Sequence, residues 1–291
     1  MKNAVALAAS PICTLGECPR WDEKTGTLYW VDIDGFALHN LDPISGALRS
    51  RTFGESIGSF ALRERGGFVL ALRSGYALLN ELYDPIERIA SPSWDIATER
   101  FNDGRCDPQG RFWAGTMYEP RDKPNARLFR LDTDLTWSAH GPGVTISNGI
   151  AVSLDQRTFY FADTPTHTVW RHDFDPIKGE LGAPTTFLTF PEGKGRPDGA
   201  VVDSAGNYWI ALFSGSRVQC YSPAGHLLDE IAVPTKNPTC LTFGGADMRT
   251  LFITTAKIKL SSDELKAQPD AGRVFTARTD IAGLIEPRFK G

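Results

Sequence analysis

The chain has 291 residues, of which 41% are hydrophobic and 23% charged, so it can build a large core and is not globally disordered. Its formal net charge is −4 (31 basic against 35 acidic side chains), and no long run of like charge occurs, which argues against a nucleic-acid partner. No apolar run approaches the ~18 residues that a membrane-spanning helix needs, so we expect no membrane partner.

The cysteine pattern indicates a reducing compartment. The number of cysteines is odd, and no two of them form a CxxC pair. The five are Cys13, Cys18, Cys106, Cys220 and Cys240. This argues against a disulfide framework or a zinc knuckle and favours small buried thiols. The first ten residues have too weak an apolar stretch for a secretory signal, so we interpret them as the lead-in to a strand and expect a cytoplasmic protein.

A turn rich in Asp and Gly, followed by an aromatic strand, recurs along the chain. The copies lie at residues 22–32, 63–72, 107–114, 155–163, 203–211 and 245–254. Successive copies start 41 to 48 residues apart, and each repeat has room for about four short strands. Four strands at this period are typical of a propeller blade, so the sequence predicts an all-β fold, a six-bladed β-propeller with four-stranded blades around a central channel.

The repeats also predict boundaries. We expect one propeller domain over residues 1–291, with the first blade at 14–50 and the last at 239–289. The N-terminal strand should pair into the last blade, because this closure removes an exposed sheet edge. Residues 261–269 start with Ser and end with Pro, which predicts a short helical insertion. The polar, Pro-rich residues 118–125 suit either a lid over the ring or an ordinary loop.

Polar side chains share one position upstream of the repeated turn, where each innermost strand would begin. Glu17, Asn102 and Asp198 lie five residues before a turn Asp, and none of the five histidines occupies such a position. Asn148 lies seven residues before one. In a closed ring these side chains would converge on one mouth of the channel. Their oxygens suit Ca²⁺, Mg²⁺ or Mn²⁺, and Zn²⁺ or Fe²⁺ less closely, although Asn-Gly and Asp-Gly are also ordinary turn sequences.

Seven short stretches carry a family pattern. They lie at residues 15–21, 100–104 (RFNDG), 107–111, 114–117, 146–149, 197–199 and 240–245. With these motifs the chain resembles the SMP-30/gluconolactonase/LRE family, the regucalcin-like sugar lactonases of bacterial type. The resemblance runs from near residue 13 to about residue 288 and therefore covers almost the whole chain.

The resemblance implies one divalent cation (Ca²⁺, Zn²⁺, Mn²⁺, Mg²⁺ or Fe²⁺) on the propeller axis, with Glu17, Asn148 and Asp198 as its direct ligands. The implied reaction is metal-dependent hydrolysis of an aldonolactone, of glucono, xylono or arabinono type, to the aldonic acid. The cation would polarise the lactone carbonyl while a water attacks. We expect Asp198 to be the catalytic base, with Asp103 in a supporting or water-orienting position as the second candidate.

The same resemblance suggests residues that bind the substrate. Asn102 would lie beside the metal and, together with Arg100, contact the sugar lactone. Glu119 follows the Gly-Thr-Met stretch and is a further candidate. The family pattern, however, would place the contacting glutamate where this chain has Pro120, so the sugar preference is expected to differ.

Two other functions fit the same residues. One is a metal-dependent esterase or phosphotriesterase, because a cation polarises P=O as readily as C=O. The other is a non-enzymatic calcium-binding propeller, whose signature would be tight metal binding without turnover. The expected partner is a small-molecule sugar lactone, whereas the particular sugar, the metal and the oligomeric state stay open.

Overall fold

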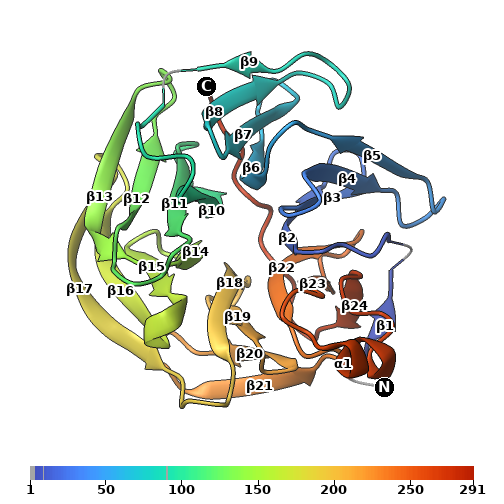
Figure 1. The fold of residues 1–291 in the computed structure, drawn as a ribbon. Helices are drawn as coiled ribbons and strands as arrows, with labels where there is room; N and C mark the ends of the chain where they lie inside the picture. Colours follow the sequence, from blue (N-terminus) through green and yellow to red (C-terminus); the bar gives the residue numbers. More distant parts are fainter. Residues whose placement is uncertain (1–3, 9, 90) are drawn as a thin grey trace.

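The computed structural model describes residues 4–8, 10–89 and 91–291, and its strands form six four-stranded antiparallel sheets arranged as blades around one axis (Figure 1). The first three blades consist of β2 (Gly16–Asp22), β3 (Thr27–Asp32), β4 (Ala37–Leu41) and β5 (Leu48–Thr52); β6 (Ile57–Leu62), β7 (Phe68–Leu72), β8 (Gly75–Leu79) and β9 (Glu87–Arg88); and β10 (Glu99–Cys106), β11 (Phe112–Tyr118), β12 (Ala126–Leu131) and β13 (Trp137–Val144). The six-bladed propeller predicted from the repeats is thus confirmed.

The other three blades complete the ring. They consist of β14 (Ser147–Val152), β15 (Thr158–Asp163), β16 (Thr168–Asp175) and β17 (Glu180–Thr189); β18 (Arg196–Val202), β19 (Tyr208–Phe213), β20 (Arg217–Tyr221) and β21 (Leu227–Ala232); and β22 (Pro238–Gly244), β23 (Thr250–Thr255), β24 (Phe275–Arg278) and β1 (Ala6–Leu7). In the last blade Leu7 lies opposite Phe275, so the N-terminal strand closes the ring as predicted.

A buried carboxylate holds the repeated turn. Asp203 accepts hydrogen bonds from the backbone N–H of Asn207 and from the indole Nε1 of Trp209, both at 2.9 Å. Asp107 holds the indole of Trp113 in the same way, again at 2.9 Å. In the third and fifth blades the turn Asp therefore ties the end of the innermost strand to a tryptophan of the second strand.

Adjacent blades pack through the aromatic side chains of their second strands. The rings of Trp113 and Phe159, from the third and fourth blades, have centroids 4.9 Å apart. Those of Tyr160 and Tyr208, from the fourth and fifth blades, are 4.7 Å apart. Aromatic pairs at this spacing stabilise a core beyond the area that they bury. The core therefore lies between the blades, which leaves the axis to polar side chains.

Every innermost strand is irregular close to its start. The register between β2 and β3 shifts between Glu17 and Arg20, and the innermost strands of the other five blades shift at the corresponding point. A β-bulge bends its strand and re-aims a side chain. The bulge repeated around the ring therefore turns equivalent side chains towards the axis.

The last blade is shorter than predicted. Its fourth strand is supplied by β1, so β24 ends at Arg278 and residues 279–291 leave the blade and cross the ring (Figure 1). Phe289 of this C-terminal tail bridges Arg63, which lies directly after the second blade's innermost strand. The tail therefore covers the end of the axis where the innermost strands finish.

The predicted helical insertion is present as α1 (Ser262–Ala267). Ser261 caps it by accepting a hydrogen bond from the backbone of Glu264, whose side chain binds back to the Ser261 N–H. In the part of the chain that the structure describes, no helix has the length and apolar character needed to cross a membrane.

The turn carboxylate gives a prediction about stability. We expect Asp203→Ala to lower the free energy of unfolding by about 3 kcal/mol, because several buried N–H donors lose their acceptor. Asp155→Ala, at an exposed copy of the turn, should cost less than about 0.5 kcal/mol. Urea denaturation of both variants is the measurement, and equal effects at the two sites would contradict the proposed role of the buried turn Asp.

Candidate functional site

One end of the axis opens into a small cavity of about 70 Å³, at the starts of the innermost strands. Its lining includes all four side chains that the sequence placed at one shared position: Glu17, Asn102, Asn148 and Asp198. They come from the first, third, fourth and fifth blades. The structure therefore brings together side chains that lie up to 181 residues apart (198 − 17) in the sequence.

Hydrogen bonds fix the orientation of the two amides. Asn148 Nδ2 donates to the hydroxyl of Thr164 (2.7 Å), which in turn donates to the carbonyl of Pro197 (2.8 Å). Asn102 Nδ2 donates to the carbonyl of Ser147 (2.9 Å) and to Asn148 Oδ1 (3.2 Å). Because an amide oxygen has two lone pairs, Asn148 Oδ1 keeps one for a further partner.

The Asn-Gly pair at this site does not form a hairpin turn, since it lies inside β14. Gly149 has a φ of 65°, and a Cβ there would lie 2.7 Å from the hydroxyl of Tyr208. That hydroxyl donates to the Gly149 carbonyl at 2.9 Å. Gly149 therefore allows the bulge that aims Asn148 at the axis, and the neighbouring blade holds the bulge in place.

The two carboxylates are buried, and the positive charges nearest to them only partly offset the effect of burial on their pKa values. Glu17 is 6% exposed and Asp198 5% exposed, and in the described part of the chain neither forms an ion pair within 4 Å. Burial, and secondarily the carboxylate of Asp103, raise the pKa of Glu17 to about 8. Burial, followed by the charges of Glu17 and Asp103, raises the pKa of Asp198 well above its usual range. Negative charge concentrated in this way requires either protons or a cation.

The donor set suits a hard cation. Among the described residues, no three His, Cys, Asp or Glu side chains gather as a metal cluster. Glu17, Asp198 and Asn148 instead provide two carboxylates and one amide oxygen at the same cavity. Oxygen donors of this kind match Ca²⁺, Mg²⁺ and Mn²⁺. All five cysteines are buried and free, and none lines this cavity.

Arg100 lies at the cavity wall with only 4% exposure. Its Nη1 donates to Asn102 Oδ1 (2.8 Å) and to the carbonyl of Phe101 (2.9 Å). Glu119, a candidate for substrate binding, does not line the cavity. It accepts two hydrogen bonds from Arg73, at 2.7 and 3.1 Å, and its Oε1 lies 3.5 Å from Arg100 Nε. Glu119 therefore holds Arg100 in place, and its contact with substrate stays a prediction.

Asp103 lies one residue further along β10 and does not line the cavity. Its Oδ2 accepts the backbone N–H of Ile150 at 3.0 Å, and burial raises the pKa of its carboxyl group. Of the two candidate bases, only Asp198 therefore faces the cavity. The catalytic role of either residue stays a prediction.

Sequence reasoning missed three cations of the cavity lining, Arg121, Arg196 and Lys259. Arg196 stands two residues before Asp198, as Arg100 stands two before Asn102, so the alignment of blades could have identified it. Arg121 and Lys259 lie on loops between strands, where no repeat exists to compare. Arg121 comes from the loop 118–125, which therefore borders the mouth, while its action as a lid stays a prediction.

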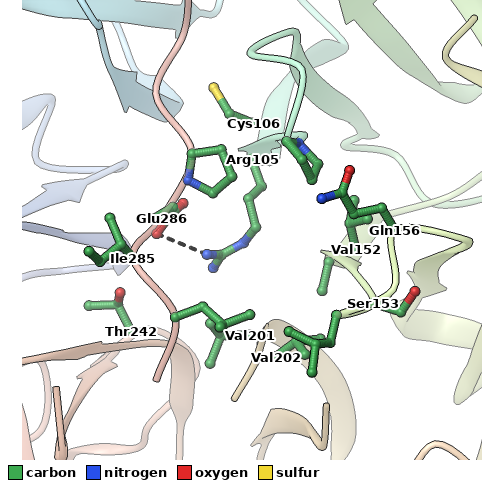
Figure 2. A pocket seen from close by; sticks show the side chains of 15 residues that line it. Arg105, Cys106, Val152, Ser153, Gln156, Val201, Val202, Thr242, Ile285 and Glu286 are labelled. Carbon is green, nitrogen blue, oxygen red and sulfur yellow. Dashed lines mark ion pairs between the residues drawn. The ribbon is translucent and has the colours of Figure 1, made fainter. Parts of the chain in front are cut away.

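A second cavity, of about 280 Å³, lies at the other end of the axis beside the C-terminal tail (Figure 2). The charged residues in its lining are Arg105 and Glu286, which pair with each other at 2.9 Å. Glu286 also lies 2.8 Å from Arg20 Nε. Because these charges neutralise one another and the surrounding side chains are mostly apolar, we assign the candidate site to the smaller cavity.

Comparison with known proteins agrees with this architecture. The sequence profile of the SMP-30/Gluconolactonase/LRE-like region matches residues 15–257. A 6-deoxy-6-sulfogluconolactonase of Pseudomonas putida is 45% identical over 278 residues, which cover 95% of each chain. Pentonolactonase XacC of Haloferax volcanii is 36% identical over 282 residues, which cover 96% of this chain and 94% of its own.

A solved structure extends the comparison to the fold. The crystal structure of a calcium-binding protein, regucalcin, from Agrobacterium tumefaciens matches with a TM-score of 0.92 at 27% identity, with 97% of each chain covered. The profile match extends over most of the propeller, and the curated relatives match it from end to end. The chain therefore belongs to the SMP-30/gluconolactonase/LRE-like family.

Proposed function

We propose that the protein is a metal-dependent sugar lactonase that hydrolyses an aldonolactone to its aldonic acid. The observation that carries the proposal is the pair of buried carboxylates, Glu17 and Asp198, which meet an oriented amide at the mouth of the propeller and form no ion pair within 4 Å in the described part of the chain. The protein is thus a hydrolase of the lactonase type, a member of a family whose named relatives act on lactones of sugar acids.

The residues present fit one divalent cation. Glu17 and Asp198 would supply charged oxygens and Asn148 a neutral one, which leaves positions open for water and substrate. A cation bound there would draw electron density from the lactone carbonyl and stabilise the negative charge that develops on its oxygen. Which of Ca²⁺, Zn²⁺, Mn²⁺, Mg²⁺ and Fe²⁺ is used is a matter for measurement.

The remaining polar side chains bind and orient the substrate. Arg100 presents a fixed guanidinium group at the cavity wall, because Glu119 and Asn102 hold it from two sides. Positioning of this kind limits the poses in which water can reach the carbonyl carbon. Water adds to that carbon, the ring C–O bond breaks, and the ring oxygen takes a proton. Glu17 and Asp198 are the carboxylates in the cavity, and we assign Asp198 to accept the proton of the attacking water.

The relatives differ in the substituent far from the lactone carbonyl. The Pseudomonas putida enzyme is named for a gluconolactone with a sulfonate at carbon 6, and the Haloferax volcanii enzyme for five-carbon lactones. We infer that the reaction at the carbonyl is common to these proteins and that the lining of the cavity away from Glu17 and Asp198 selects the sugar.

Activity on lactones is the first prediction of this proposal. Protein stripped of metal should not turn over five- and six-membered aldonolactones, and adding one of Ca²⁺, Mg²⁺, Mn²⁺, Zn²⁺ or Fe²⁺ should restore turnover. A pH indicator detects the acid released, and the spontaneous rate is subtracted. Metal-restored turnover of aryl esters or phosphotriesters with none of any lactone would favour the esterase function instead. Tight metal binding without turnover would favour a binding propeller.

Removal of either ligand carboxylate should abolish most of the activity. We expect Glu17→Gln and Asp198→Asn to lower kcat/KM by at least about 100-fold and to weaken metal binding. Glu64→Gln, at an exposed glutamate away from the cavity, is the matched control and should leave both unchanged. Full metal-dependent turnover by either ligand variant would show that the metal site lies elsewhere.

The pH dependence of stability tests the metal site without any substrate. The pKa of Glu17 is raised from 4.5 to about 8 in the folded chain, so between these values the folded state binds more protons than the unfolded state. This contribution to stability is complete below about pH 4.5 and is lost as the pH rises through about 8. The Tm of the metal-stripped protein should therefore fall over this range. Added cation should raise the Tm most at the alkaline end.

Glu17→Gln supplies the control for this titration, because it removes one of the coupled carboxyl groups. It should flatten the dependence of Tm on pH in the metal-stripped protein and reduce the Tm increase caused by added cation. A Tm that does not fall as the pH rises, together with no response to any of the five cations, would contradict a cation at this site.

A further inference from the structure

The mouth of the candidate site is positively charged on a protein whose net charge is −4. Besides Arg100, three cations line the cavity: Arg121, Arg196 and Lys259. The acidic side chains in the same lining are Glu17 and Asp198. Four positive charges therefore face two negative ones before any metal is bound. The excess would attract a substrate with a negative group.

Three separate segments supply these cations. Arg121 follows β11, Arg196 begins β18, and Lys259 follows β23. Arg196 Cζ lies 5.6 Å and Lys259 Nζ 5.8 Å from the centre of the same ring, that of Phe213. Arg196 is also the strand partner of Phe213 across β18 and β19. The apolar ring thus holds two cationic head groups on one wall of the cavity.

The three cations lie near carboxylates without pairing with them: the charge of Asp198 acts on Lys259 and that of Glu119 on Arg121. Neither an ion pair within 4 Å nor a side-chain hydrogen bond joins Arg121, Arg196 or Lys259 to another residue there. Burial, and then the charges of Arg121 and Arg196, lower the pKa of Lys259. Burial, and then the charge of Arg196, lower the pKa of Arg121. Arg121 and Lys259 are exposed and Arg196 is half-buried, so water screens part of the repulsion between these like charges, and a bound anion would remove the rest.

The backbone fixes the direction of two of these cations. Arg121 has a φ of 61° and Lys259 a φ of 60°, so both stand in the left-handed region. Eight other non-glycine residues of the described chain share this conformation, among them Phe36 and Gln156 away from the cavity, so it orients the two side chains without itself marking a site.

We propose that Arg121, Arg196 and Lys259 form an anion subsite, and that the lactone hydrolysed here carries a sulfonate or phosphate group at the end remote from its carbonyl. This inference rests on the lactonase function proposed above. Three cations supplied by three separate segments match a tetrahedral group with three free oxygens, whereas a planar carboxylate offers two. Arg196 stands two residues from Asp198, about 7 Å along the strand, which is on the scale of one sugar unit.

The test compares three lactones on the metal-loaded enzyme: D-glucono-1,5-lactone, its 6-phosphate and its 6-deoxy-6-sulfonate. We expect one anionic lactone to have a kcat/KM at least about tenfold above that of the neutral lactone, and the preference to shrink with added salt. Comparison of kcat/KM for the 6-phosphate with that for the 6-deoxy-6-sulfonate identifies which anion is used. Equal kcat/KM for all three lactones would overturn the subsite while leaving the lactonase function standing.

Substitution of each cation tests whether the preference for an anionic lactone arises at the proposed subsite. Arg196→Met, Lys259→Met and Arg121→Met should each raise KM for the anionic lactone, and reduce the ratio of anionic to neutral kcat/KM by about tenfold. Lys194→Met is the matched control, because this exposed lysine near Arg196 does not line the cavity, and it should leave the ratio unchanged. Variants that lower both rates equally would show a structural role and overturn the proposal.

Direct binding separates failure of the subsite from failure of the proposed function. Calorimetry with the open-chain products, gluconate, 6-phosphogluconate and the 6-sulfonate, needs no turnover. Tighter binding of a doubly anionic acid than of gluconate, lost in Lys259→Met, would support the subsite even if no lactone were hydrolysed. Equal binding of all three acids would overturn it, and would also show that the cations serve only the carboxylate that every product carries.

Discussion

The structure depends on how charge is accommodated along the propeller axis. At the end covered by the C-terminal tail, Glu286 lies 2.9 Å from Arg105 (Figure 2). It also lies 2.8 Å from Arg20. Both arginines are buried, and in the described part of the chain Glu286 is the carboxylate that pairs with each of them within 4 Å. The tail is therefore part of the ring rather than an appendage. At the other end, Glu17 and Asp198 form no comparable pair, and this difference between the two ends distinguishes a structural ion pair from a candidate site.

The candidate site is rigid because it is built across blades. The amide of Asn102, from the third blade, binds Asn148 in the fourth, and Asn148 reaches through Thr164 to the carbonyl of Pro197 in the fifth. Each step joins neighbouring blades, so the amide and carboxylate oxygens hold their relative positions as long as the ring stays closed. Pre-organised donors of this kind need no rearrangement when charge develops in a reaction. The pairing of β1 with β24, far from the site, thereby contributes to its geometry.

The features that could be predicted from the sequence are those that repeat from blade to blade. Six copies of a turn rich in Asp and Gly indicated the ring, and the shared position of Glu17, Asn102 and Asp198 indicated the convergence, because equivalent strands in a ring face the same axis. The sequence could not predict the C-terminal tail, because the contacts of residues 279–291 are not repeated from blade to blade. Nor could it show that Glu119 binds Arg73 and Arg100, since such pairing depends on how loops of two blades meet.

Strand positions repeat in every blade and loop positions do not, and this difference also separates the residues proposed for the reaction from those proposed to select the substrate. Glu17, Asn148 and Asp198 stand at bulges of innermost strands, where the fold itself fixes them. Arg121 and Lys259 stand on loops, which accept insertions and substitutions without disturbing a blade. A family built on this frame can therefore keep one reaction at the carbonyl while its loops change the sugar. On that view, the charges carried by the loops around the mouth are more informative about the substrate than the residues proposed to bind the metal.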